Sequence, residues 1–155
     1  MFGGSIEYDI DLSQAGCGCD VAAYIVRMPA RNADGSPRPG DDGSYYCDAM
    51  ASRGAYCPDI DLMEANKFAF DMTLHKCDEP NAKEHYFNCD TGLTCGAALH
   101  SGPPKHPHDY DQYRYGPSEL HDINTLNPFH VKINFINKNE KLDRIELLMT
   151  QAGGG

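Results

Sequence analysis

The sequence contains no apolar stretch approaching the run of about 18 residues that a membrane-spanning helix needs. Basic residues are also few: 13 Lys and Arg stand against 23 Asp and Glu, which gives a net charge of −10. Because phosphate backbones and anionic lipids attract positive charge, this balance argues against a nucleic acid or a membrane surface as partner. Neutral or cationic ligands fit the charge better.

The first residues lack the basic and apolar segments of a secretory signal. If the protein is secreted, we expect the signal to have been removed or to lie outside this sequence. At 155 residues the chain is predicted to form one domain over residues 1–155, long enough for one substantial core, with residues 152–155 as a flexible tail.

Cysteine is abundant for a cytosolic domain of this size, which favours disulfides and an oxidising compartment. The seven cysteines are Cys17, Cys19, Cys47, Cys57, Cys77, Cys89 and Cys95. A zinc site would need paired Cys or His knuckles, and Cys17-Gly18-Cys19 is one residue too short for the usual loop. Because the number is odd, one thiol is free, pairs with another chain, or has its partner outside this sequence.

Three carboxylates lie close together in one short apolar stretch, at Asp59, Asp61 and Glu64. In a regular strand Asp59 and Asp61 share a face and Glu64 points away. A β-bulge at Leu62-Met63 would return Glu64 to their face, and all three acids would line one cleft. Like charges at that spacing push one pKa up while another stays low, as an acid and a nucleophile require. A solvated acidic edge strand and a Ca²⁺ site remain the alternatives.

Alternating apolar residues predict β-strands at both ends of the chain, and nothing in the sequence indicates a convincing amphipathic helix. We expect antiparallel pairing of the first two strands, a polar turn at 137–141 between the last two, and an all-β fold of two stacked antiparallel sheets of jelly-roll type. The strands expected outside the acidic stretch are residues 5–12, 21–28, 130–136 and 144–150.

Two polar regions could suggest metal binding. The segment 32–43 resembles a calcium loop only in part, because the required spacing and the terminal Glu are absent. Residues 78–128 are rich in Pro, Gly, Asn and Asp and are predicted to be long ordered loops pinned by disulfides. His100, His106 and His108 stand among prolines there, which is more typical of a solvated loop. We therefore predict neither metal nor cofactor.

Several segments, in the same order, resemble those of glycoside hydrolase family 7, the fungal and protist cellobiohydrolases and endoglucanases. The stretch DIDLMEAN at 59–66 is similar to the family signature E-x-D-x-x-E-A-N. Further similar segments are YCD at 46–48, TLHKC at 73–77, CDTGLTC at 89–95, YGP at 115–117 and NPFHV at 127–131, and the strands at 6–12 and 23–28 agree as well. The match runs over about residues 5–136.

The resemblance implies a concanavalin A-like jelly roll that cleaves β-1,4-glucan with retention of configuration. Position by position, it implies Asp59 as nucleophile, Asp61 as the residue that orients it, and Glu64 as acid/base. It further implies His75 near the acid/base, a glucan cleft lined by Tyr24, Tyr46 and Asp48, and disulfides Cys47–Cys57 and Cys77–Cys89. A bridge from Cys17 or Cys19 to Cys95 is a further expectation. The implied partner is a β-glucan and the implied location extracellular.

Three departures from the family pattern bear on function. Asp replaces Glu at the nucleophile position, which withdraws the carboxylate by one C–C bond, about 1.5 Å. The chain has no tryptophan to stack on sugar rings, so stacking falls to its nine tyrosines. It is also much shorter than the family's catalytic core. We therefore expect a β-glucan hydrolase of reduced size, or alternatively a glucan-binding lectin-like or cell-wall matrix protein; a truncated product without independent function is a third reading.

Overall fold

The computed structural model describes residues 3–90, 95–100 and 114–152. Every regular element in these ranges is a β-strand, which confirms the predicted all-β class. No helix in the described part of the chain is long and apolar enough to cross a bilayer. The strands are β1 (Ser5–Ile10), β2 (Val21–Val26), β3 (Asp59–Ala65), β4 (Ala69–His75), β5 (Cys95–His100), β6 (Tyr115–Gly116), β7 (Ile123–Asn124), β8 (Phe129–Lys138) and β9 (Lys141–Thr150).

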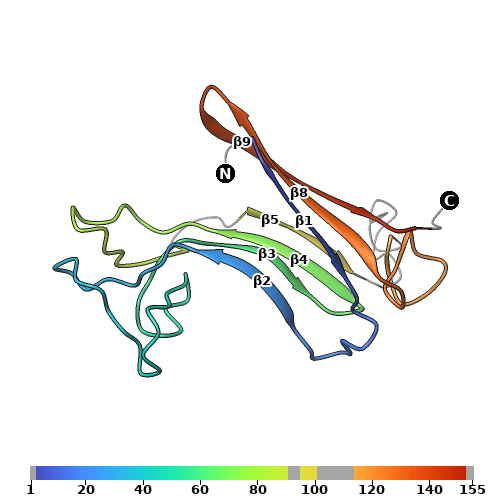
Figure 1. The fold of residues 1–155 in the computed structure, drawn as a ribbon, viewed down its shortest axis with the longest axis horizontal. Helices are drawn as coiled ribbons and strands as arrows, with labels where there is room; N and C mark the ends of the chain where they lie inside the picture. The colour runs from blue at the N-terminus through green and yellow to red at the C-terminus, as the bar shows by residue number, and fades with distance from the viewer. Residues whose placement is uncertain (1–2, 91–94, 101–113, 153–155) are drawn as a thin grey trace. The chain divides into compact units, whose positions relative to one another are not determined.

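The strands form one sheet of order β1-β8-β9, a second of order β2-β3-β4-β5, and a short parallel pair, β6 and β7 (Figure 1). The expected pairing of the first two strands is therefore wrong, because β1 pairs antiparallel with β8. That register sets Ile6 opposite Ile133 and Tyr8 opposite Val131. Apolar residues thus meet across the ladder, and this long-range match outweighs the shorter connection to β2.

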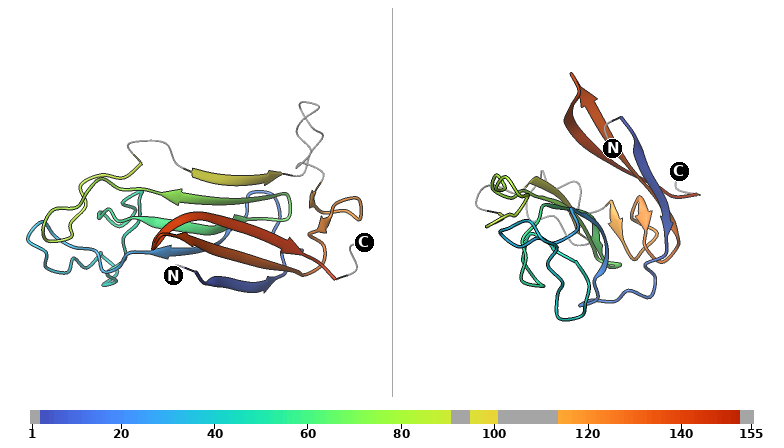
Figure 2. Two further views of the ribbon diagram at one scale, coloured as in Figure 1. Left: turned by 90° about the horizontal axis from the view of Figure 1, so that it is seen from above. Right: turned by 60° about the vertical axis from the view of Figure 1, so that its left-hand side comes forward.

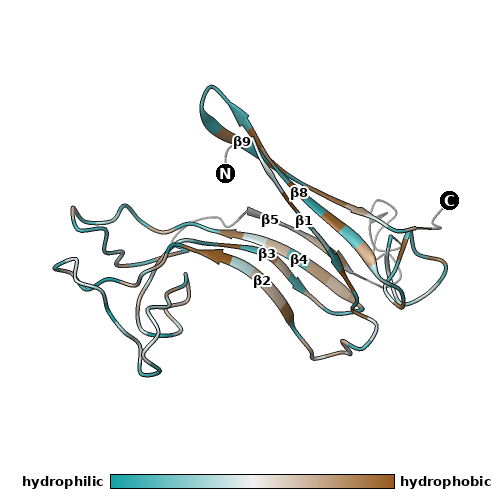
Figure 3. Ribbon diagram, viewed as in Figure 1, coloured by the Kyte–Doolittle hydropathy of each residue, from teal (hydrophilic) through white to brown (hydrophobic). Residues whose placement is uncertain are grey.

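The β8–β9 hairpin confirms the predicted pairing of the last two strands, although both strands are longer than predicted (Figure 2). Its turn consists of Asn139 and Glu140, which have φ of 53° and 61°. Two consecutive positive φ values are what a two-residue hairpin turn matching the strand twist requires. Along β8, Val131, Ile133 and Phe135 are buried and alternate with more exposed neighbours. Figure 3 shows alternating hydrophobic and hydrophilic bands along this strand.

By contacts the chain divides into two compact units. The first comprises residues 1–21, 65–70 and 98–155, and the second residues 22–64 and 71–97. In the first unit the fully buried Tyr115 makes edge-to-face contacts with Phe70 and Phe129, with ring centroids 6.1 and 5.9 Å away. Its hydroxyl donates to the Asn66 carbonyl at 2.7 Å. The buried polar atom is therefore satisfied and fixes the turn between β3 and β4.

The second unit has a core built on two disulfides, Cys47–Cys57 and Cys77–Cys89, as the resemblance implied. All four cysteines are buried, together with Ala30, Ala49, Ala55 and Tyr86. Cys17 and Cys19 are free and exposed, contrary to the expected bridge to Cys95. Some of the predictions fall outside the described part of the chain. They concern the side chains of Cys95 and His100, residues His106 and His108, and the last three residues of the expected flexible tail.

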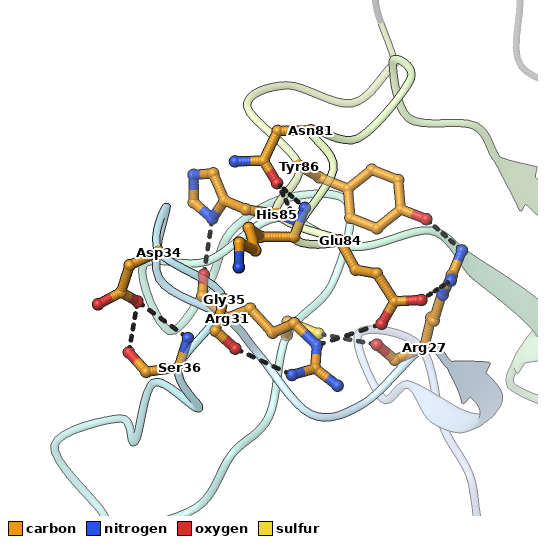
Figure 4. Close-up of polar contacts among 11 residues, drawn as sticks. Arg27, Arg31, Asp34, Gly35, Ser36, Asn81, Glu84, His85 and Tyr86 are labelled. Atoms are coloured by element: carbon orange, nitrogen blue, oxygen red, sulfur yellow. Dashed lines mark hydrogen bonds and ion pairs between the residues drawn. The ribbon is translucent and has the colours of Figure 1, made fainter.

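Polar contacts bind the segment after β2 to the loop before Cys89 (Figure 4). Glu84 pairs with Arg27 at 3.0 Å and with Arg31 at 3.4 Å, and the Arg27 guanidinium also donates to the Tyr86 hydroxyl. Residues 78–90 therefore form an ordered loop pinned by the Cys77–Cys89 disulfide, as predicted. The prediction of loops throughout 78–128 is wrong at β5, β6 and β7; β6 and β7 are two residues each, too short to show a periodicity in the sequence.

Candidate active site

Strand β3 carries the three acids predicted to form the site. Asp59 is buried at 7% exposure, Asp61 is partly buried and Glu64 is exposed. Strict alternation of burial breaks at two places, because Ile60 and Asp61 are both partly buried and Leu62 and Met63 are both buried. The second break falls where the sequence predicts a bulge, which stays a prediction. Glu64 is exposed and does not lie in the apolar interior. That it shares a cleft with Asp59 and Asp61 stays a prediction.

Asp59 is tied to the loop closed by the first disulfide. Its Oδ2 accepts a hydrogen bond from the Ala49 N–H at 3.2 Å, whereas its buried Oδ1 has no partner within the described ranges. Burial raises the pKa of the Asp59 carboxyl, the Ala49 hydrogen bond opposes this, the charge of Asp61 adds to it, and the charge of His75 again lowers it. Asp59 therefore holds a proton more readily than a solvent-exposed aspartate does.

Strand β4 places His75 beside these acids. Phe70 and Met72 are buried on one face of β4, so alternation puts Asp71 and His75 together on the other. His75 Nε2 lies 2.9 Å from Asp61 Oδ2, and its Nδ1 lies 2.6 Å from Asp90 Oδ2. The three side chains are largely shielded, with 17% exposure for His75, 13% for Asp61 and 24% for Asp90. His75 thus contacts Asp61 and Asp90, and its predicted position near the acid/base Glu64 stays a prediction.

The carboxylates around His75 raise the pKa of its imidazole. Burial acts to lower the pKa of His75, but the hydrogen bond and charge of Asp90, together with the charges of Asp59 and Asp61, raise it above the usual value. The protonated His75 of β4 therefore lies among the carboxylates of Asp59, Asp61 and Asp90. Such a cluster can hold and move a proton near neutral pH.

Two of the predicted substrate contacts, Tyr24 and Tyr46, lie together. Their rings meet edge to face with centroids 6.2 Å apart, and Tyr24 is 47% exposed. Burial, a hydrogen bond with Tyr24 and the charge of Asp48 raise the pKa of Tyr46, so its phenol stays protonated. Asp48 is buried and accepts hydrogen bonds from the Ser52 N–H and hydroxyl. Asp48 therefore holds its own loop, and its contact with substrate stays a prediction.

Sequence reasoning did not single out Asp71 or Asp90. The alternation of Asp71, Thr73 and His75 could have indicated that Asp71 shares the face of His75. Only the Cys77–Cys89 disulfide could have indicated that Asp90 lies near His75, because the bond joins the residue before Asp90 to Cys77, two residues after His75. Among the described residues no group of three or more His, Cys, Asp or Glu is arranged to hold a metal ion.

A cavity of about 730 Å³ lies at the neighbouring ends of β2, β3 and β4. Its apolar lining includes Ile25, Ile60 and Leu74. By alternation Ile60 and Leu74 lie on the pleat opposite to Asp59 and His75. Asp59 and His75 also line it, whereas Asp61 and Glu64 do not. The cavity therefore shares two residues with the acid site.

The strand order and acid cluster define an antiparallel β protein with a carboxylate and imidazole site. Its fold is that of solved cellulases: endoglucanase I complexed with cellobiose superposes with a TM-score of 0.73 at 20% identity, covering 98% of this chain and 42% of that one. A cellobiohydrolase from Daphnia pulex gives a TM-score of 0.66 at 21% identity, covering 96% of this chain and 43% of that chain. The predicted jelly-roll class is thereby confirmed.

The model of glycosyl hydrolase family 7 matches residues 48–154. This chain belongs to that family. Endoglucanase 1 of Humicola insolens is 28% identical over 99% of this chain, and endoglucanase type C of Fusarium oxysporum is 24% identical over 95% of it. The chain spans 42% and 38% of the lengths of these two relatives.

Proposed function

We propose that this chain is a hydrolase of β-1,4-linked glucan that works through the carboxylates of β3. The observation that carries the proposal is the contact between His75 and Asp61, which joins the acids of β3 to β4. Family membership and the endoglucanase names of its relatives support this choice of substrate. Because the chain spans only part of their length, the activity of the whole relatives is a hypothesis for this chain.

In the proposed reaction Glu64 acts as acid/base, and its exposure leaves the carboxyl open to a sugar oxygen. Asp59 attacks the anomeric carbon or activates water, and Asp61 orients Asp59. The reaction needs Asp59 ionised, which its buried position opposes and the His75 charge favours.

Asp in place of Glu at position 59 bears on the stereochemical outcome. Retaining glycosidases hold their two carboxyls about 5 to 5.5 Å apart and inverting ones about 6.5 to 9.5 Å, which leaves room for a water. A side chain shorter by one C–C bond, about 1.5 Å, opens the gap toward the inverting range. The anomer of the first product distinguishes retention, as in the family, from inversion by a water that Asp59 activates.

The decisive experiment measures reducing-end release from cello-oligosaccharides and soluble β-glucan by the wild type and Glu64→Gln. We expect release by the wild type and a loss of at least about 100-fold in the variant, since general acid catalysis contributes that much. Glu119→Gln, an exposed acid outside the site, is the matched control and should retain full activity. No release by the wild type between pH 4 and 8 would sink the proposal.

Two features of Asp59 favour a second function: its raised pKa, and a side chain one methylene shorter than that of the family nucleophile. A chain that had lost chemistry for this reason would still bind glucan as a lectin-like or wall-matrix protein. It would then bind cello-oligosaccharides saturably, with equal affinity in the wild type and Glu64→Gln. Absence of binding to any glucan tested would exclude this reading.

An extracellular location is part of the proposal. The two buried disulfides support it, because such bonds persist in oxidising compartments. The proposed partner is a β-glucan polysaccharide or oligosaccharide, and the acidic charge disfavours nucleic acid and anionic membranes. Fractionation of the source organism and mass spectrometry of the intact disulfides would test the location.

A further inference from the structure

Asp90 lies just beyond the second disulfide, outside every strand, and its carboxylate nevertheless reaches the acid site. Its Oδ2 is 2.6 Å from His75 Nδ1, the shorter of the two contacts that this imidazole makes with carboxylates. Its Oδ1 is buried and has no hydrogen-bond partner within the described ranges. The Asp90 carboxylate therefore contacts His75 and not the described residues of its own loop.

The backbone holds Asp90 in one place. Cys89 is bonded to Cys77, two residues after His75, and the Asp90 N–H donates to the Lys76 carbonyl at 2.8 Å. Asp90 also has φ of +55°, in the left-handed region that a non-glycine residue occupies only when its surroundings determine it. These constraints fix the residue against the end of β4 and aim its side chain at the ring.

The two contacts of His75 set the number of protons that Asp61, His75 and Asp90 share. Two N···O contacts below 3 Å need a proton in each, and a neutral imidazole supplies only one. The second proton is either on the other ring nitrogen or on a carboxyl group. In both arrangements Asp61, His75 and Asp90 together carry a net charge of −1. Without Asp90 the ring could be neutral and turn either nitrogen toward Asp61.

We propose that Asp90 is a positioning residue for the acid site: its carboxylate accepts the Nδ1–H of His75 and favours the imidazolium, whose Nε2–H then points to Asp61. The proposal rests on the hydrolase function proposed above and adds a residue to its machinery. Asp90 acts through His75, because a carboxylate that accepts from one ring nitrogen fixes the orientation of the imidazole.

Through the charge of His75, Asp90 also affects the ionisation of Asp59. The groups that face His75 are Asp59 and Asp61 from β3 and Asp90 from the segment after Cys89. A charged His75 lowers the pKa of Asp59, whereas Asp61 and Asp48 raise it. Removing Asp90 makes the imidazolium less favourable, so Asp59 becomes harder to ionise. If Asp59 must be ionised for reaction, the acid limb of the pH profile moves to higher pH.

The test compares the wild type, Asp90→Asn and the control Asp41→Asn, an exposed aspartate that loses the same charge. The ring nitrogens of His75 are followed by NMR of ¹⁵N-histidine protein across pH, assigned by the signal missing in His75→Gln. In parallel, kcat and KM on cello-oligosaccharides are measured across pH. In Asp90→Asn we expect His75 to titrate at lower pH, the acid limb of kcat to move to higher pH, and KM to change little.

A His75 titration that is the same in Asp90→Asn and the wild type overturns the proposal. So does an unchanged pH profile of kcat in an active variant. If Asp90→Asn does not fold, Asp90→Gly replaces it, because glycine accepts φ of +55° without strain. A wild type without hydrolysis overturns the proposed function instead, and the placement by Asp90 is then judged on the NMR titration alone.

Discussion

The imidazole Nε2 of His75 lies 2.9 Å from Asp61 Oδ2, across 14 residues of sequence. This contact makes the acids of β3 and the end of β4 one electrostatic unit. Protonation of one group therefore changes the free energy of ionising the others, and this coupling underlies the predictions for Asp59→Asn and His75→Gln.

Lengthening Asp59 tests its proposed attack on the sugar. Asp59→Glu extends the carboxylate by about 1.5 Å, and we expect kcat to rise by about 10- to 100-fold with KM little changed, because a misplacement of about 1 Å has effects of that size. Product anomers are read by NMR immediately after mixing. A slower Asp59→Glu that releases the inverted anomer would show instead that Asp59 activates water.

Removing the charge of Asp59 should stabilise the fold. Because the folded-state pKa is raised above 3.8, the native state binds more protons than the unfolded state between these two pKa values, and stability falls as pH rises through that window. Asp59→Asn should therefore have a higher Tm than the wild type at pH 7, by about 2–4 °C for each kcal/mol recovered. The difference should vanish as pH falls below 3.8. A lower Tm at pH 7 would contradict the assignment of a buried, destabilising carboxylate.

His75 should stabilise the fold in the opposite pH range. Its folded-state pKa is raised above 6.5, so its contribution is complete below 6.5 and is lost as pH rises through the folded value. At pH 5.5 we expect His75→Gln to lower the free energy of unfolding by about 2 kcal/mol, the size of a hydrogen bond to a charged group. Urea denaturation at pH 5.5 and at pH 9 measures the effect. An equal loss at both values would mean that His75 acts by packing.

Tyr24 is predicted to contact sugar, and the chain contains a matched control. Tyr24 is 47% exposed and Tyr45 is 44% exposed, so truncating either removes a similar area. We expect Tyr24→Ala to lose about 1 kcal/mol of binding to cello-oligosaccharides, roughly a fivefold rise in Kd, and Tyr45→Ala to lose little. Calorimetric titration at constant pH makes the comparison. Equal effects of the two variants would remove Tyr24 from the proposed cleft.

The second disulfide should stabilise the chain and hold Asp90. It closes a loop of sequence separation 12, and we expect Cys77→Ala with Cys89→Ala to lower the free energy of unfolding by about 3 kcal/mol. The control is Cys17→Ala with Cys19→Ala, which removes two exposed free thiols and should change stability little. Urea denaturation of both double variants measures this. Similar stabilities would indicate that contacts other than the disulfide hold the loop.

Several elements were predictable because their patterns are local. Alternating Val131, Ile133 and Phe135 indicate a strand buried on one face, and the spacing of Asp59 and Asp61 indicates that they share a face. The partner of β1 was not predictable in this way, because Ile6 and Tyr8 would present an equally apolar face to several strands. The pairing with β8 depends on apolar contacts between residues more than 120 positions apart.

The amino-acid sequence alone determined that this is an all-β, disulfide-bonded chain with three acids in one strand, since alternation and residue type are properties of neighbouring positions. The tertiary structure alone decided that Asp59 is buried, that His75 lies between Asp61 and Asp90, and that β1 pairs with β8. The physical reason is that burial and charge coupling depend on distance in space, and chain folding brings together groups whose separation along the sequence carries no such information.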